Sequence, residues 1–180
     1  GGPLTLALGD SPPRFFYYGE ISSISQALTM QMFDTLIDFD LETYELVPGL
    51  ARDWSVSDDG TVITLHLRED VAWHDGTPFT ADDVVFTFDQ IVTNPEARAG
   101  DAASFIFTVD GEQRPATFTA PDANTVVITL PTPAPAFLLF LRSFYIMPKH
   151  KLLPFSVEGG AQPADINDAW PTDVEPSEVV

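Results

Sequence analysis

Adjacent carboxylates occur at Asp58–Asp59 and at Asp82–Asp83, and such pairs can carry out general acid–base chemistry. That chemistry requires one carboxyl group of a pair to be buried, so that its pKa rises and it can hold a proton. Each pair also has a local structural explanation. The first pair lies in a tight turn, and the second lies in the first turn of a helix, where negative charge stabilises the helix dipole. A structural role is therefore favoured, and an acidic hydrolase using these pairs is the alternative hypothesis.

The three histidines are the other residues that could bind a metal or move a proton. His66 is predicted on a strand, His74 beside a turn and His150 near the end of a segment, without the paired spacing on one element that favours zinc. His74 precedes Asp75 and could be an oriented base, although a histidine that hydrogen-bonds across the hairpin is the favoured interpretation. The sequence contains no glycine-rich phosphate loop or nucleophile elbow. We therefore expect no metal, no cofactor and no enzymatic activity.

The composition limits the classes of partner. Twenty-seven acidic residues against eight basic ones give a net charge of −19, which excludes nucleic acid and anionic membrane surfaces as expected partners. The acidity is typical of a highly solvated surface, and attraction for cationic ligands is the alternative. The chain has no cysteine and hence no disulfide. The longest apolar run, residues 136–141, is far shorter than the ~20 residues of a membrane-spanning helix, and no secretion signal is expected within the sequence.

Residues 54–88 contain the elements that position these groups. Asp59 and Gly60 predict a tight reversal, because aspartate bonds to its own backbone and glycine accepts a positive φ. The strands on either side must then pair antiparallel. After the reversal, Ile63, Leu65 and Leu67 alternate with more polar residues, which predicts a half-buried strand.

A second turn and a helix follow this strand. Asp75 and Gly76 predict the turn, and Thr80 stands at the N-cap of the helix with Asp83 three residues later to return the hydrogen bond. Asn94 and Pro95 end the helix. Its single predicted apolar face consists of Val84, Val85, Phe88, Ile91 and Val92.

The N-terminal part of the chain predicts a strand, an aromatic loop and a helix. Residues 4–8 alternate like a short strand, and residues 15–18 are four consecutive aromatics, which either stack on a ligand or pack between lobes. The helix is predicted from Leu28, Met32, Phe33 and Leu36. A change of chain direction is expected between residues 38 and 45.

The second half of the chain is predicted to be rich in strands. We expect a strand over residues 105–109, a hairpin over residues 117–130 that turns about Pro121 and Asp122, and a short helix over residues 137–141. The tail from residue 159 to residue 180 has few apolar anchors, which predicts poor order.

Residues 49–88, reading GLARDWSVSDDGTVITLHLREDVAWHDGTPFTADDVVFTF, resemble the signature of extracellular solute-binding proteins, family 5, the oligopeptide, dipeptide and nickel type. Residues 124–137 and the Ile-Met-Pro-Lys-His run at 146–150 resemble further segments of this family. The resemblance implies a structural role for the most visible signature residues. They are Trp54, Asp59, Gly60, Trp73, His74, Asp75, Gly76, Thr80 and Asp83.

The resemblance implies an α/β fold that is an N-terminal fragment of a type II periplasmic binding protein. Residues 1–36 would begin lobe I, residues 37–142 would form a β-rich lobe II, and residues 143–180 would return to lobe I. The missing C-terminal part of the same protein would complete lobe I and form lobe III, and ligand is clamped between lobes I and III. Such proteins are exported to the periplasm or cell exterior, in some cases with a lipid anchor or signal segment, and deliver solutes to the membrane permease of an ABC importer.

The resemblance also implies where a ligand would touch this chain. By register from Phe33, the loop that passes the ligand cleft corresponds to Ile21, Ser22, Ser23 and Ile24. Phe105 is a second candidate for the edge of the cleft, and a core position in lobe II is its alternative role. The ligand class stays open among oligopeptides, dipeptides, nickel complexes, haem, opines and sugars. A free-standing β-rich interaction module is the third functional alternative.

Overall fold

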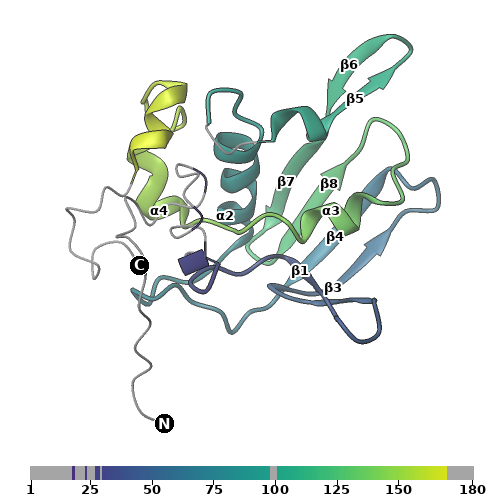
Figure 1. The fold of residues 1–180 in the computed structure, drawn as a ribbon, viewed down its shortest axis with the longest axis horizontal. Coiled ribbons are helices and arrows are strands. Elements are labelled where there is room, and N and C mark those ends of the chain that lie inside the picture. The colour runs from purple at the N-terminus through teal and green to yellow at the C-terminus, as the bar shows by residue number, and fades with distance from the viewer. Residues whose placement is uncertain (1–17, 19–22, 24–26, 29, 98–100, 170–180) are drawn as a thin grey trace.

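The computed structural model describes residues 18, 23, 27, 28, 30–97 and 101–169 of the chain. A four-stranded antiparallel sheet forms its centre (Figure 1), in the order β3 (Ala51–Val56), β4 (Val62–Leu67), β8 (Thr125–Thr129) and β7 (Thr117–Asp122). Ile63 pairs with Ile128 and Leu65 with Val126, so these apolar side chains share one face of the sheet. All four are buried, which confirms the predicted alternation.

The two predicted turns are present and use the expected residues. In the first, Asp59 Oδ1 accepts hydrogen bonds from the Thr61 amide at 3.0 Å and from the Ser57 hydroxyl at 2.6 Å. Gly60 adopts a φ of 71°, which is open to glycine because it has no Cβ. In the second turn Gly76 has a φ of 85°. The reversal between residues 54 and 67 is therefore confirmed, with β3 and β4 antiparallel.

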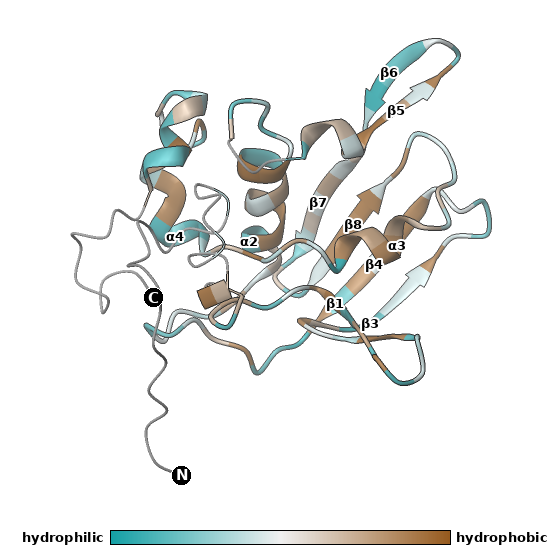
Figure 2. Cartoon of the chain, in the orientation of Figure 1, coloured by the Kyte–Doolittle hydropathy of each residue, from teal (hydrophilic) through white to brown (hydrophobic). Residues whose placement is uncertain are grey.

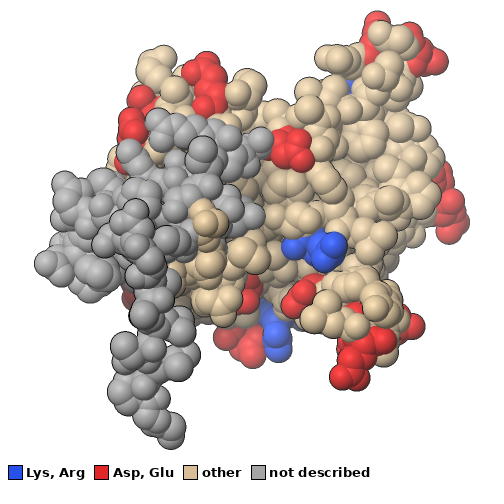
Figure 3. All heavy atoms as spheres, viewed as in Figure 1, with Lys and Arg blue, Asp and Glu red and all other residues tan. Residues whose placement is uncertain are grey.

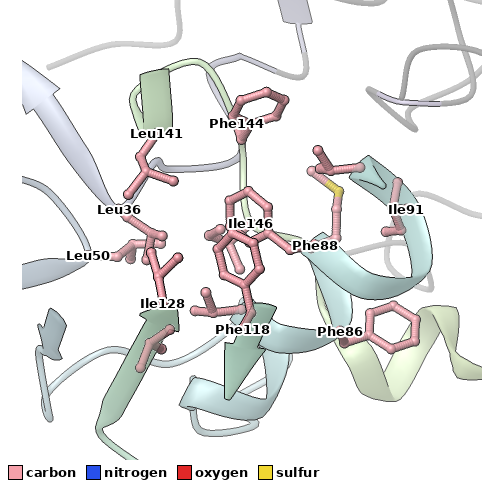
Figure 4. Close-up of a cluster of buried hydrophobic side chains, with 14 of the residues drawn as sticks. Leu36, Leu50, Phe86, Phe88, Ile91, Phe118, Ile128, Leu141, Phe144 and Ile146 are labelled. Atoms are coloured by element: carbon pink, nitrogen blue, oxygen red, sulfur yellow. The ribbon is translucent and has the colours of Figure 1, made fainter. Parts of the chain in front are cut away.

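A helix packs on the sheet beside β7 and β8. It begins as α2 (Ala81–Phe86) and continues as one π-helical segment over Thr87–Val92, before ending at Thr93. The predicted buried residues are confirmed except Val85, which is only partly buried. The prediction of a single apolar face is wrong, because Phe86 is also buried and points away from Phe88 in Figure 4. The helix is covered on two sides, by the sheet and by α4 (Lys149–Leu152).

Two small hairpins complete the strands. The first joins β1 (Ile37–Phe39) to β2 (Leu46–Pro48), which confirms the expected change of direction. The second joins β5 (Ile106–Val109) to β6 (Glu112–Pro115) and projects from the body of the protein in Figure 1. The hairpin of β7 and β8 is also confirmed, although its turn lies at residues 123–124, after Pro121 and Asp122.

The predicted helix over residues 28–36 is wrong beyond its start. Residues 27 and 28 are helical, but the chain turns at residues 30–32 and then becomes extended. Thr35 forms a β-bridge with Tyr145, and Asp34 O accepts the Ile146 amide at 3.0 Å. The apolar spacing fitted a helix, but pairing with a segment more than a hundred residues away determines the backbone here.

The second half of the chain includes α3 (Phe137–Leu141), as predicted, and the 3-10 segments Ala102–Phe105, Leu153–Phe155 and Pro163–Asp168. Residues 159–169, part of the tail for which we predicted poor order, make contacts with the rest of the protein. Ile166 is 1% exposed, and Asn167 Nδ2 donates to Glu96 O at 2.8 Å. The strand expected at residues 4–8, the aromatics at 15–17 and residues 170–180 lie outside the described part. The three-part division into lobes stays a prediction.

Phenylalanine side chains form the centre of the core. Phe88 stacks on Phe118 with ring centroids 4.1 Å apart, and Phe105 lies 5.1 Å from Phe144 (Figure 4 shows Phe88 between Phe118 and Phe144). Figure 2 shows the apolar residues concentrated on β4, β8, α2 and α3. Within the described residues, no helix has both the length and the apolar character needed to cross a membrane.

Phe105 tests whether this aromatic cluster stabilises the protein. Phe105→Ala removes a fully buried ring, so we expect a loss of about 3–5 kcal/mol in unfolding free energy, measured by urea denaturation of the whole protein. Ile106→Ala, at a neighbour that is 41% exposed, is the control and should cost less than about 1 kcal/mol. Equal effects of the two substitutions would contradict the assignment of Phe105 to the core.

Candidate functional site

The acidic signature residues meet the Pro148–Lys151 segment at one side of the protein. Asp75 Oδ1 accepts the Thr77 amide at 2.9 Å, which closes the turn. Asp75 Oδ2 lies 2.8 Å from His150 Nε2 and 3.3 Å from Lys151 Nζ. The turn that follows β4 is therefore tied to α4, which lies 75 residues further along the chain.

These contacts determine the charge of Asp75. The hydrogen bond from the Thr77 backbone, followed by the one from His150, holds the pKa of the Asp75 carboxyl well below its ordinary value. The side chain stays ionised near neutral pH, so it cannot donate a proton as a general acid there. These contacts suit an electrostatic link between the turn at Asp75 and α4.

Asp83 is the buried acidic residue of this region, with only 5% of the residue exposed. Its Oδ2 accepts the Thr80 amide at 2.9 Å, as the predicted capping box requires, and lies 3.4 Å from Trp73 Nε1. Its Oδ1 accepts the Lys149 amide at 2.9 Å. One carboxylate thus joins the start of α2, the signature tryptophan and the start of α4.

Thr87 adds to this junction between α2 and the chain before α4, one helical turn after Asp83. Its hydroxyl donates to Asp83 O at 2.8 Å and accepts the Met147 amide at 2.9 Å. Thr87 and Met147 are both fully buried. The extended chain before α4 is therefore fixed along α2 by side chains, without belonging to a sheet with it.

Lys149 adds an ion pair at the outer side of the junction. Its Nζ lies 2.7 Å from the Glu158 carboxylate, and this hydrogen bond raises the pKa of Lys149. The charged groups of the junction therefore pair with one another, which is the pattern of a structural site.

The three histidines have different surroundings. His66 Nδ1 bonds to Asp53 across the hairpin, whereas the His74 ring is exposed and makes no hydrogen bond among the described residues. The bond across the hairpin expected for His74 is therefore wrong, because this ring lies on the outside of the turn. The group that meets Asp75 is His150. Within the described residues, no group of three or more potential metal ligands is close enough to hold an ion.

Two adjoining hollows lie where β1, β2 and the segment that leads into the turn at Asp75 and Gly76 approach one another. The larger, about 280 Å³, is lined by Asp34, Asp38 and Arg68 among others, and the smaller, about 60 Å³, by Trp73 and His74. Both include Asp34, Leu50 and Val71 in their walls. They combine apolar walls with groups of both charges, which is the chemistry of a site for a small polar solute.

The residues predicted to contact ligand are only partly described. Ser23 is helical and exposed, while Ile21, Ser22 and Ile24 lie outside the described residues. Phe105 is fully buried among aromatic rings, which is the alternative role that we considered for it. Ligand contact by these residues stays a prediction.

The sequence did not predict the contact of Asp75 with His150 or the contact of Asp83 with Lys149. The partners are 75 and 66 residues apart, and local spacing gives no signal at that distance. The one available signal was that both segments resemble parts of the same family signature.

Comparison with known proteins gives a consistent result. The model of the bacterial extracellular solute-binding proteins, family 5 (middle part), matches residues 45–177. The dipeptide-binding protein of Escherichia coli is 40% identical over 84 residues, which are 43% of this chain and 15% of that protein. The peptide transport periplasmic protein SapA of Salmonella typhimurium is 34% identical over 131 residues, which are 68% of this chain and 24% of that protein.

A solved structure shows the same arrangement of elements. The ABC transporter substrate-binding protein CtaP of Listeria monocytogenes superposes with a TM-score of 0.65 and 31% sequence identity, over 79% of this chain and 28% of that one. The chain therefore spans less than a third of the length of each of these relatives.

The adjacent carboxylates allow a matched test of the junction. Asp83→Asn places an amide nitrogen against amide donors, so we expect a loss of about 2–4 kcal/mol in unfolding free energy. Asp82→Asn, at an exposed position in the same helical turn, should cost less than about 1 kcal/mol. Urea denaturation of both variants measures the difference, and comparable losses would rule out the special role of Asp83.

Asp75 should make stability depend on pH in a specific window. Because its pKa is lowered in the folded protein, its contribution is present in full above the ordinary value of 3.8 and is lost as the pH falls below it. The protein should therefore be more stable than Asp75→Asn at pH 7, and this difference should shrink between about pH 4 and about pH 2. Thermal unfolding at each pH measures it. Asp58→Asn, in the other turn, is the control and should change stability little at pH 7; a difference for Asp75→Asn that grew on acidification would contradict the assignment.

Proposed function

Because the chain belongs to the bacterial extracellular solute-binding proteins of family 5, we propose that the whole protein captures a peptide or similar small solute and delivers it to the permease of an ABC importer. The match of the family model to residues 45–177 is the main support for this proposal. It includes both partners of the Asp75–His150 and Asp83–Lys149 contacts. The fold is accordingly that of part of a type II periplasmic binding protein, as the resemblance implied.

The described residues would serve mainly as scaffold. The junction around Asp83 and Asp75 holds α2 and α4 together, while the solute would approach the hollows beside Asp34 and Arg68 and residues 21–24. The remaining length of the protein would supply the opposing lobe. Closure of the lobes around the solute by a hinge would signal to the permease that the protein is loaded.

A peptide is the proposed solute class. The two curated relatives carry the names dipeptide-binding protein and peptide transport periplasmic protein. Peptides of different sequence share a backbone, so a site that bonds to backbone groups in a hydrated cavity accepts many of them. A nickel complex, haem, an opine or a sugar would be alternative outcomes of a binding test.

The place of action would be outside the cytoplasmic membrane. The matched family is described as extracellular, and the Salmonella typhimurium relative SapA carries the name periplasmic protein. The strongly acidic composition suits a protein surface that does not adhere to an anionic membrane surface. A lipid or signal segment would keep it near the importer.

Neither alternative function gains support. A hydrolase would need a carboxyl group that is free to exchange a proton, whereas Asp59 closes a turn and Asp83 accepts bonds from both ends of a junction. A free-standing interaction module does not agree with membership of a family whose members are several times longer than this chain.

The proposal is tested by purifying the whole protein and identifying the bound solute by native mass spectrometry. We expect a bound mass that corresponds to short peptides and disappears after partial unfolding and dialysis. Calorimetry with di- and oligopeptides then gives affinities, and loss of the protein should abolish peptide uptake by the cell. A protein that retains no small solute, or that converts its ligand chemically, would contradict the proposal.

A further inference from the structure

Tyr18, the last of the four consecutive aromatics at residues 15–18, is held inside the protein. It is 1% exposed and belongs to the buried core. Its hydroxyl donates to Tyr145 O at 3.0 Å, although the two residues are 127 positions apart in the sequence. A buried tyrosine hydroxyl needs a hydrogen-bond partner, and the Tyr145 carbonyl is one. The Tyr18 ring therefore packs on the protein and is not accessible for stacking on a ligand.

The peptide group that accepts the Tyr18 hydroxyl also holds the chain at Asp34. The carbonyl of Tyr145 and the amide of Ile146 belong to one peptide bond, and the Ile146 amide donates to Asp34 O at 3.0 Å. A peptide group is planar and rigid, so its carbonyl and its N–H keep a fixed relative position. Both ends of residues 18–34 are therefore bonded to the same rigid unit.

This peptide group is fixed in the body of the protein. Ile146 is 1% exposed and is one of the buried side chains of Figure 4. The segment that follows it is bonded to α2 through the contacts of Thr87 and Asp83 that are described above. The position of residues 18 and 34 is thereby coupled to the position of α2.

The chain after Asp34 is bonded in turn to the start of β3. The Leu50 amide donates to Thr35 O at 3.0 Å, and the Ala51 amide donates to Leu36 O at 2.9 Å. The Asp34 end of residues 18–34 is thus held by several backbone hydrogen bonds. At the other end, the Tyr18 hydroxyl is a side-chain contact, which a single substitution can remove without changing the backbone.

Residues 18–34 include positions at which we expect the solute. Asp34 lines both hollows, and the contacts predicted from the family resemblance lie between Tyr18 and Asp34. They are Ile21, Ser22, Ser23 and Ile24. Fixing the two ends of a segment reduces the number of conformations open to it, so less conformational entropy is lost when a ligand orders it.

We propose that Tyr18 is a positioning residue for solute binding, which acts through the peptide group between Tyr145 and Ile146. This inference rests on the proposed function. The Tyr18 hydroxyl does not touch the solute, and it restrains the residues that do. Removal of the hydroxyl should therefore weaken solute binding even when the ring stays in the core and the protein stays folded.

Tyr18→Phe tests this role, because it removes the hydroxyl and keeps the buried ring. Ser156→Ala is the matched control. Ser156 is 2% exposed, its hydroxyl also donates to a backbone carbonyl, Leu153 O at 2.8 Å, and it lies after α4. Neither substitution changes a charge, so the acidic side chains that Figure 3 shows on the drawn face exert the same long-range field in both variants.

Both variants are made in the whole protein, and trialanine is the probe in calorimetry, because its small side chains leave the peptide backbone as the main binding group. Loss of one buried hydroxyl bond should lower the melting temperature of each variant by no more than about 4 °C. Tyr18→Phe should also weaken trialanine binding about five- to ten-fold, whereas Ser156→Ala should stay within about two-fold of the unaltered protein.

Amide hydrogen exchange in the absence of peptide gives a second readout. The Ile146 amide should exchange faster in Tyr18→Phe than in the unaltered protein, and Ser156→Ala should leave its rate unchanged. A substitution that only lowers global stability would not single out this amide.

Trialanine affinity that is unchanged in Tyr18→Phe, or weakened equally in both variants, would overturn the positioning role. An Ile146 amide with the same exchange rate in all three proteins would also overturn it. An unaltered protein that binds no peptide would reject the proposed function and the positioning role together. Normal binding by the unaltered protein, with unchanged affinity in Tyr18→Phe, would reject the positioning role alone.

Discussion

The carboxylate of Asp83 is the constraint on which the rest of the structure depends. A charged group at a buried position is stable only if its oxygen atoms find donors, and three segments provide them: the helix start at Thr80, the ring of Trp73 and the backbone of Lys149. The positions of these segments are therefore coupled. Without this residue the start of α2 would lose its bond to the Lys149 amide, whereas the bond between Thr87 and the Met147 amide would remain.

The aromatic core provides the second level of organisation. The phenylalanines of the π-helical segment after α2, of β7, of α3 and of the segment around Phe105 pack in one cluster, so elements that are adjacent in space but distant in sequence share a single core. Such a core resists local rearrangement, because removing one ring leaves a void that its neighbours cannot fill. Ile37 of β1 belongs to the buried core, and the ring of Phe107 in β5 lies 6.2 Å from that of Phe137.

Much of this fold could be predicted because the signals were local. The turns at Gly60 and Gly76, the strand alternation and the cap at Thr80 each depend on residues within about five positions, and each was confirmed. The contacts that local patterns missed are non-local: the extended chain at Thr35 pairs with Tyr145, and Asn167 donates to Glu96 O. The contact of Asp75 with His150 belongs to the same class. The proposed function rests on family membership, because the paired charges around Asp75 and Lys149 carry no chemical signature of a solute.

A crystal structure of the whole protein with its bound solute would test the central claim most directly, since the claim is that the acidic signature residues are scaffold. The account predicts that the Asp83 oxygens still bond to the amides of Thr80 and Lys149, that Asp75 still meets His150, and that none of these oxygens touches the solute. An Asp75 or Asp83 carboxylate that had released its protein donors and bound the solute would contradict the account.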